Sequence, residues 1–174
     1  MSTSGDIPMI YSVTVQYGRQ NRQNLISAGA YSRIDKAIYW PTWNRIVCSE
    51  DGISYYHKAF DTGEATLFGE IYISEERIDG DGMIKHLHSK KMRGATVEEI
   101  LAFGSQYPEI QRQFPVVAVG GVLDCSHDAQ MEMVVLDNNA SGRTIETIWT
   151  AGGDKFLIGT HFLVFPDDRG YFEI

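Results

Sequence analysis

The chain begins with a pattern of period two. Between residues 9 and 17, apolar or aromatic side chains fill the odd positions and largely polar ones the even positions. Because successive side chains of a strand point to opposite faces, this pattern predicts a half-buried β-strand. The polar stretch GRQNRQN, residues 18–24, then predicts a loop. Residues 25–40 are compatible with either a helix or a strand, since Tyr31, Ile34 and Ile38 fit a helical face while KAIYW fits a strand.

Further strands are predicted as a meander. RIVCS and ISYYHKAF flank the turn EDG, which indicates a hairpin because Asp-Gly favours tight turns. The stretch EERIDGDG, residues 75–82, predicts a loop because it combines acids with glycines. The other strand candidates are ATLFGEIYIS, VVAVGGVL, QMEMVVLD, RTIETIWT, KFLIGTHFLVF and an edge strand in the tail GYFEI. The glycine pair in VGGV is typical of a bulge or of close strand packing.

A helix is predicted to start at Thr96. Thr96 fits the N-cap and Glu99 the capping-box position, and Pro108 ends this helix and can start a short second one. Since short links favour antiparallel pairing, the predicted fold class is α+β. It is predominantly antiparallel β, a sandwich or open barrel-like sheet, with one or two helices around residues 96–114.

Composition bounds the class of protein. The chain has 174 residues, 43% of them hydrophobic, which predicts a single globular domain over residues 1–174. Its net charge of -8 disfavours nucleic acid as a partner. No basic start with an apolar segment suggests a secretory signal, and no apolar run is long enough to cross a membrane, so neither export nor a membrane partner is expected. Cys48 and Cys125 are interpreted as two buried thiols of a cytoplasmic protein.

The stretch KHLHSKKMRG, residues 85–94, carries two histidines two positions apart. In an extended segment, His86 and His88 would project to the same face, and His127 would be a third donor for a metal ion. These residues do not stand at a recognised metal-ligand spacing. An exposed pair in a polar linker is therefore the favoured interpretation, and no cofactor is expected.

The same stretch is the most basic part of the chain. No acidic residue lies between Asp81 and Glu98. An anion could bind here, just before a helix N-terminus, although Glu98 and the acid after it would repel it. The alternative, a solvated basic connector to the Thr96 helix, is favoured. The candidate anion-binding residues are Lys85, Lys90, Lys91 and Arg93.

Two other stretches carry candidate chemistry. In DCSHD, Cys125 stands beside His127 and Asp128, but residues two apart seldom form a nucleophile–base pair, so a turn with a half-buried thiol is favoured. The aromatic segment YWPTW could form an exposed platform for a base, sugar or peptide, or could belong to the core. The candidate interaction surface consists of Tyr39, Trp40 and Trp43.

Three hypotheses of function follow. The first is a non-catalytic soluble binding protein, inhibitor-like, immunity-like or self-associating, whose partner is another protein or a second copy in a homo-oligomer. The second is an enzyme acting on a phosphorylated or anionic small molecule, with residues 85–93 meeting the loop 124–128. The third is a ligand-binding β domain whose pocket Tyr39, Trp40 and Trp43 would line. No phosphate-binding loop, nucleophile elbow or zinc-protease motif identifies an enzyme, so the first hypothesis is favoured and the question of catalysis stays open.

Overall fold

The computed structural model describes residues 9–39, 47–48, 54–56, 63–125, 130–150, 155–167 and 172–173. Helices are α1 (Arg19–Gly29), the 3-10 helix η1 (Lys36–Tyr39), α2 (Gly80–Ser89), α3 (Val97–Gln106) and α4 (Pro108–Gln111). Strands are β1 (Tyr11–Tyr17), β2 (Arg33–Ile34), β3 (Val47–Cys48), β4 (Ser54–Tyr56), β5 (Gly63–Ile73), β6 (Met92–Gly94), β7 (Val116–Cys125), β8 (Gln130–Asn139), β9 (Gly142–Thr150), β10 (His161–Pro166) and β11 (Phe172–Glu173). None of the helices in these ranges is long and apolar enough to cross a membrane.

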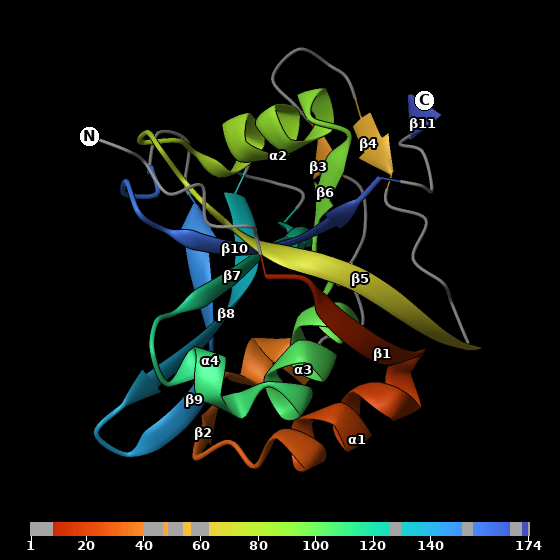
Figure 1. Cartoon of the computed structure of the whole chain (residues 1–174), viewed down its shortest axis with the longest axis vertical. Coiled ribbons are helices and arrows are strands. Elements are labelled where there is room, and N and C mark those ends of the chain that lie inside the picture. The colour runs from red at the N-terminus through yellow and green to blue at the C-terminus, as the bar shows by residue number, and fades with distance from the viewer. Residues whose placement is uncertain are drawn as a thin grey trace.

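An eight-stranded, mostly antiparallel sheet organises the described part of the chain, which confirms the predicted α+β class. Its strand order is β1-β5-β10-β7-β8-β9-β2, with β6 also pairing β10. Two pairs, β10–β7 and β2–β9, are parallel. The long strand β5 pairs β1 through residues 63–69 and β10 through residues 70–73, so it crosses the curled sheet (Figure 1). The hairpin β3–β4 and the edge strand β11, both predicted, form a separate three-stranded sheet.

Both faces of the central strands are buried. Val116, Val134 and Leu163 belong to a core shared with α1 and α3, whereas their neighbours Val117 and Val135 belong to a second core under α2. Figure 1 shows α2 on one side of the sheet and α1, α3 and α4 on the other. Strands that are covered on both faces have continuous apolar runs, which explains the sequences VVAV, MVVL and FLVF.

The helices divide into predicted and unpredicted ones. α3 has the expected capping box, since the Glu99 N–H donates to Thr96 Oγ1 and the Thr96 N–H donates to Glu99 Oε2. α4 begins at Pro108, as predicted. The predicted loop over residues 18–24 is wrong, because residues 19–24 form the start of α1. Tertiary contacts hold this polar helix, with Ile26 in the core and Arg22 ion-paired to the buried Glu98.

A buried cation joins three helices to the sheet. Arg143 on β9 is only 9% exposed. Its guanidinium donates to the carbonyl oxygens of Gly29 (2.6 Å) and Gly104, and to Gln111 Oε1 (3.1 Å). The guanidinium also lies 4.8 Å from the centre of the Tyr31 ring. Because Gly29 and Gly104 lie in the last turns of α1 and α3, Arg143 satisfies carbonyl groups that helix ends leave without partners.

Two glycines allow β6 and β7 to approach closely. The register of β7 against β8 shifts between Ala118 and Val122, which is the bulge that VGGV predicts. At this bulge the Gly120 N–H donates to the carbonyl of Ala95 at 2.9 Å. A Cβ at Gly120 would lie 2.3 Å from the carbonyl oxygen of Gly94. The missing side chain is therefore a requirement of this packing.

We expect Gly120→Ala to lower the free energy of unfolding by about 3 kcal/mol, because the new methyl group meets backbone that cannot rotate away. Gly159→Ala is the matched control, since a Cβ there meets nothing within 4 Å and only the φ of +86° opposes it. That control should cost about 1 kcal/mol. Urea unfolding of both variants measures the difference, and equal losses would show that close packing at Gly120 contributes nothing.

Candidate functional site

A pocket lies between the end of β5 and the helix α2. Its volume is about 370 Å³. It is lined by Tyr72, Ser74, Glu75, Glu76, Ile78, Met83 and His86. Strand β5 contributes the tyrosine, the segment after it the two glutamates, and α2 the methionine and the histidine. The volume lies at the lower end of the range for ligand pockets, which suits a small group or a single side chain.

Local sequence places His86 at this pocket. Asp79 caps the N-terminus of α2 by accepting a hydrogen bond from the Gly82 N–H at 2.7 Å. Met83 and Leu87 are buried against the sheet. His86 is adjacent to both on the helix surface, one turn after Met83 and one position before Leu87, so it stands at the border of the buried face.

The chemistry of the pocket centres on a tyrosine–histidine pair. The Tyr72 hydroxyl and His86 Nε2 are 2.7 Å apart and share a hydrogen bond. Burial raises the pKa of Tyr72, and the negative charges of Glu75 and Glu76 raise it further. The ammonium of Lys90 lies 5.9 Å from the centre of the Tyr72 ring. The two carboxylates therefore generate a negative potential at the tyrosine, and a cation already lies over its ring.

A turn with two exposed apolar residues is hydrogen-bonded to Ser74, one of the residues that line the pocket. The Ser74 hydroxyl donates to the Leu157 carbonyl at 2.9 Å, and the Gly159 N–H donates to the Ser74 carbonyl at 2.8 Å. These bonds hold the turn 157–160 against the pocket wall. Leu157 and Ile158, in this turn, are 64% and 66% exposed and are here named the apolar rim. The prediction of a strand from residue 155 is wrong for this turn, because β10 begins only at His161.

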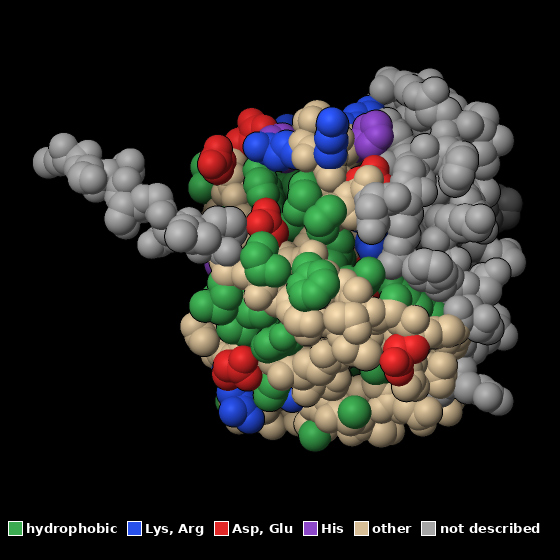
Figure 2. Space-filling view, turned by 45° about the vertical axis from the view of Figure 1, so that its right-hand side comes forward, with side chains coloured by type: hydrophobic (Ala, Val, Ile, Leu, Met, Phe, Trp, Pro, Cys, Tyr) green, Lys and Arg blue, Asp and Glu red, His purple; other side chains and the backbone are tan. Residues whose placement is uncertain are grey.

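One face of the molecule illustrates how charge and apolar surface are distributed (Figure 2). Hydrophobic side chains gather in the middle of this face, with acidic side chains beside them. Lys, Arg and His side chains lie along its upper edge, at the height that α2 has in Figure 1. Basic and acidic groups thus occupy neighbouring parts of this surface.

The structure separates His86 from His88. The interpretation of residues 85–94 as a connector is wrong for residues 85–89, which belong to α2. The predicted loop 75–82 is also wrong from Gly80 on, where α2 begins. On a helix, residues two apart point about 200° from each other, so His86 reaches the pocket while His88 is exposed. His127 lies outside the described residues. Within the described ranges, no group of three or more His, Cys, Asp or Glu side chains is placed to hold a metal ion.

The candidate anion-binding residues have different surroundings. Lys85 forms an ion pair with Asp81 at 3.0 Å, one turn earlier on α2. Lys90 and Lys91 are exposed where α2 ends. Arg93 is 1% exposed and lies in the core. The anion-binding prediction therefore concerns two surface lysines, one paired lysine and one buried arginine.

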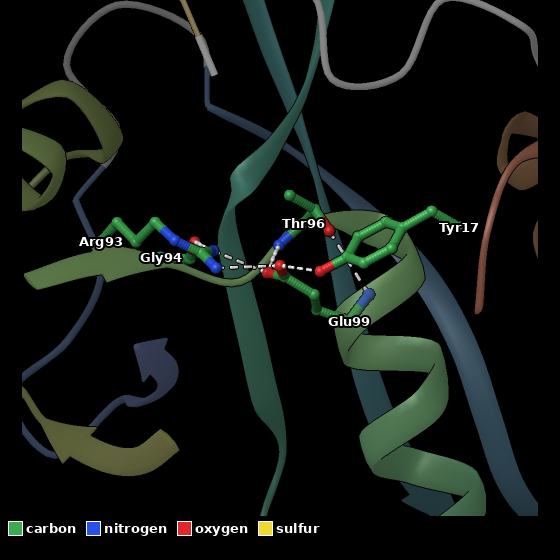
Figure 3. A network of polar contacts seen from close by, with 5 residues as sticks. All are labelled: Tyr17, Arg93, Gly94, Thr96 and Glu99. Carbon is green, nitrogen blue, oxygen red and sulfur yellow. Dashed lines mark hydrogen bonds and ion pairs between the residues drawn. The ribbon is translucent and has the colours of Figure 1, made fainter. Parts of the chain in front are cut away.

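Arg93 belongs to a buried polar network around Glu99 (Figure 3). Its Nη1 and Nη2 donate to the two carboxylate oxygens of Glu99 at 2.7 and 3.0 Å. The Tyr17 hydroxyl donates to the same carboxylate at 2.7 Å, and the Thr96 N–H at 2.8 Å. Figure 3 shows Arg93 and Tyr17 reaching Glu99 from opposite sides. Glu98 and Glu99 lie in the first turn of α3, as predicted, and both carboxylates are buried and ion-paired to arginines.

Other predicted residues stay predictions. Trp40, Trp43 and the turn 126–129 lie outside the described residues, and the side chains of Tyr39, Asp124 and Cys125 are not described either. His161 is half-buried, and its ring stacks on Phe114 with 3.9 Å between the ring centres. Burial lowers the pKa of His161.

Sequence reasoning missed Tyr72, Glu75 and Glu76 because strand alternation and acidic loops are common. One signal was available for α2, since Asp79 is an N-cap residue followed by apolar residues at 83, 84 and 87. The glycines at 80 and 82 disfavour a helix and so argued against that signal. The chain matches no known family model, no curated protein and no solved structure.

Proposed function

We propose that the protein is a non-catalytic, cytoplasmic binding protein whose partner is another protein that presents a basic segment. The observation that carries this proposal is the pocket beside α2, which Glu75 and Glu76 line and whose Ser74 is hydrogen-bonded to the turn that carries the apolar rim. Carboxylates attract lysine and arginine side chains, and exposed apolar patches mark interaction sites. An acidic pocket with an apolar rim therefore suits a basic residue flanked by apolar ones.

Charge favours a different protein over a second copy of this chain. The sequence has 23 acidic and 15 basic residues. A symmetric contact through the pocket would bring Glu75 and Glu76 of two copies together, and like charges at an interface cost several kcal/mol. A basic partner would also associate faster because opposite charges steer the encounter.

Self-association by pairing a strand of a second copy with β1, at one edge of the sheet, is also disfavoured. Gln106 of α3 donates to the Thr14 carbonyl at 2.7 Å and accepts from the Thr14 N–H at 3.1 Å. The Tyr107 hydroxyl donates to the Ser12 carbonyl at 2.8 Å. Side chains thus occupy backbone groups of β1 that a second β-strand would need. This argues against self-association through β1.

The same surroundings weaken the alternative of an enzyme for an anionic substrate. That hypothesis assigns substrate binding to Lys85, Lys90, Lys91 and Arg93. Arg93 is bound to Glu99 in the core, and the histidine that reaches a pocket faces two carboxylates rather than a basic cluster. The pocket therefore favours a cation as its occupant.

Selection from a random peptide display library, with the purified full chain as bait, tests the proposal. We expect enrichment of peptides in which lysine or arginine is flanked by apolar residues. The double variants Glu75→Gln/Glu76→Gln and Leu157→Ser/Ile158→Ser should lose most of that binding. Glu109→Gln is the control, since Glu109 is exposed on α4 and does not line the pocket. Enrichment of acidic peptides, or equal binding by all variants, would contradict the proposal.

A further inference from the structure

The position of Lys90 indicates how the pocket recognises a basic residue. Lys90 follows the last residue of α2 and is exposed, yet its ammonium lies over the ring of Tyr72, 5.9 Å from the ring centre. The face of an aromatic ring attracts cations because it carries negative charge density. The chain thus places one of its own ammonium groups at the wall of its acidic pocket.

The rest of the pocket suits the same group. The Tyr72 hydroxyl and His86 Nε2 are occupied with each other, so the ring face of Tyr72 is its accessible feature. Glu75 and Glu76 are exposed at the pocket, and their negative charges add to burial in raising the pKa of the Tyr72 hydroxyl. Ile78 and Met83 provide apolar wall for the methylene stem of a long side chain.

We propose that the pocket accepts a single lysine side chain of the partner, and that Lys90 competes with it for the ring of Tyr72. This inference rests on the proposed function and specifies its recognition site. Lys90 is then an internal competitor that lowers the affinity for any incoming lysine. Loss of its positive charge, by substitution or by acetylation, would increase that affinity.

Titration of the ¹⁵N-labelled full chain with Nα-acetyl-lysine methylamide, followed by NMR, tests the inference. We expect shifts of the amide signals of Tyr72, Ser74 and His86, with weaker or no shifts from the neutral isostere Nα-acetyl-norleucine methylamide. Lys90→Met should tighten binding of the lysine probe about two- to fivefold, the effect of removing one exposed cation–π competitor. Lys91→Met, the exposed neighbouring lysine, should leave the affinity unchanged.

The outcomes separate the two proposals. Equal affinity of the wild type and Lys90→Met would overturn the competition, and equal binding of the norleucine probe would overturn the lysine pocket. If the peptide selection enriches basic peptides while the lysine probe moves no pocket signals, only the present inference fails. If neither experiment shows binding of basic groups, the proposed function fails with it.

Discussion

Replacing Glu99 by glutamine is expected to lower the free energy of unfolding by about 3–5 kcal/mol, which is typical of breaking a buried ion pair from one side. Glutamine keeps the shape of the side chain but removes its charge. The Arg93 guanidinium, 1% exposed, would then be buried without a compensating carboxylate. Urea unfolding of the full chain, monitored by tryptophan fluorescence and circular dichroism, measures the loss.

A double variant separates the ion pair from the general cost of altering the core. Arg93→Met/Glu99→Gln removes both charges and keeps an acceptor for the Tyr17 hydroxyl and the Thr96 N–H, so we expect it to lose less stability than Glu99→Gln alone. Glu109→Gln, an exposed substitution on α4, should change stability by no more than about 0.5 kcal/mol. A loss of under 1 kcal/mol for Glu99→Gln would show that the network does not support the native state.

Arg143→Met is expected to lower the free energy of unfolding by about 3 kcal/mol. Methionine fills part of the space but donates no hydrogen bond, so the carbonyls of Gly29 and Gly104 and the amide oxygen of Gln111 lose their donor. Each buried acceptor left without a partner costs about 1–3 kcal/mol, partly recovered by relaxation of the structure. The ends of α1 and α3 should therefore loosen.

Two comparisons make this prediction specific. Arg112→Met changes an exposed arginine only one position beyond α4 and should have little effect on stability. Hydrogen exchange should show faster exchange in the last turns of α1 and α3 in Arg143→Met, with the first turn of α3 unchanged. Uniform exchange changes along both helices, or no loss of stability, would mean that Arg143 does not hold these helix ends.

Local pattern predicted those elements whose signals lie within a few neighbouring residues. The alternation in residues 9–17 is the burial pattern of β1, because a strand with one buried face must alternate. Thr96 and Glu99 predicted the start of α3, since a capping box is formed within four residues. The VGGV bulge and the antiparallel pair β3–β4 were also predicted correctly, because their glycine and turn signals lie within a few residues.

Features that depend on contacts between distant residues could not be predicted from the local pattern. The sequence of α1 is too polar to indicate a helix, and its position depends on an ion pair between Arg22 and Glu98, 76 residues apart. Arg93 looked like part of a solvated basic stretch, although it is buried with Glu99. Nothing in a local pattern states whether a charge will meet its partner in the core.

The sequence by itself therefore determined the α+β class, most strands and the capped helix α3, because hydrophobic period and capping chemistry act over one or two turns of chain. Only the tertiary structure decided which charges are buried and which histidine faces a pocket. Tyr72 and His86 are 14 residues apart, and the turn that carries the apolar rim, at residues 157 and 158, is bonded to Ser74 beside them. Such a site exists only once the sheet has brought β5, α2 and the turn before β10 together.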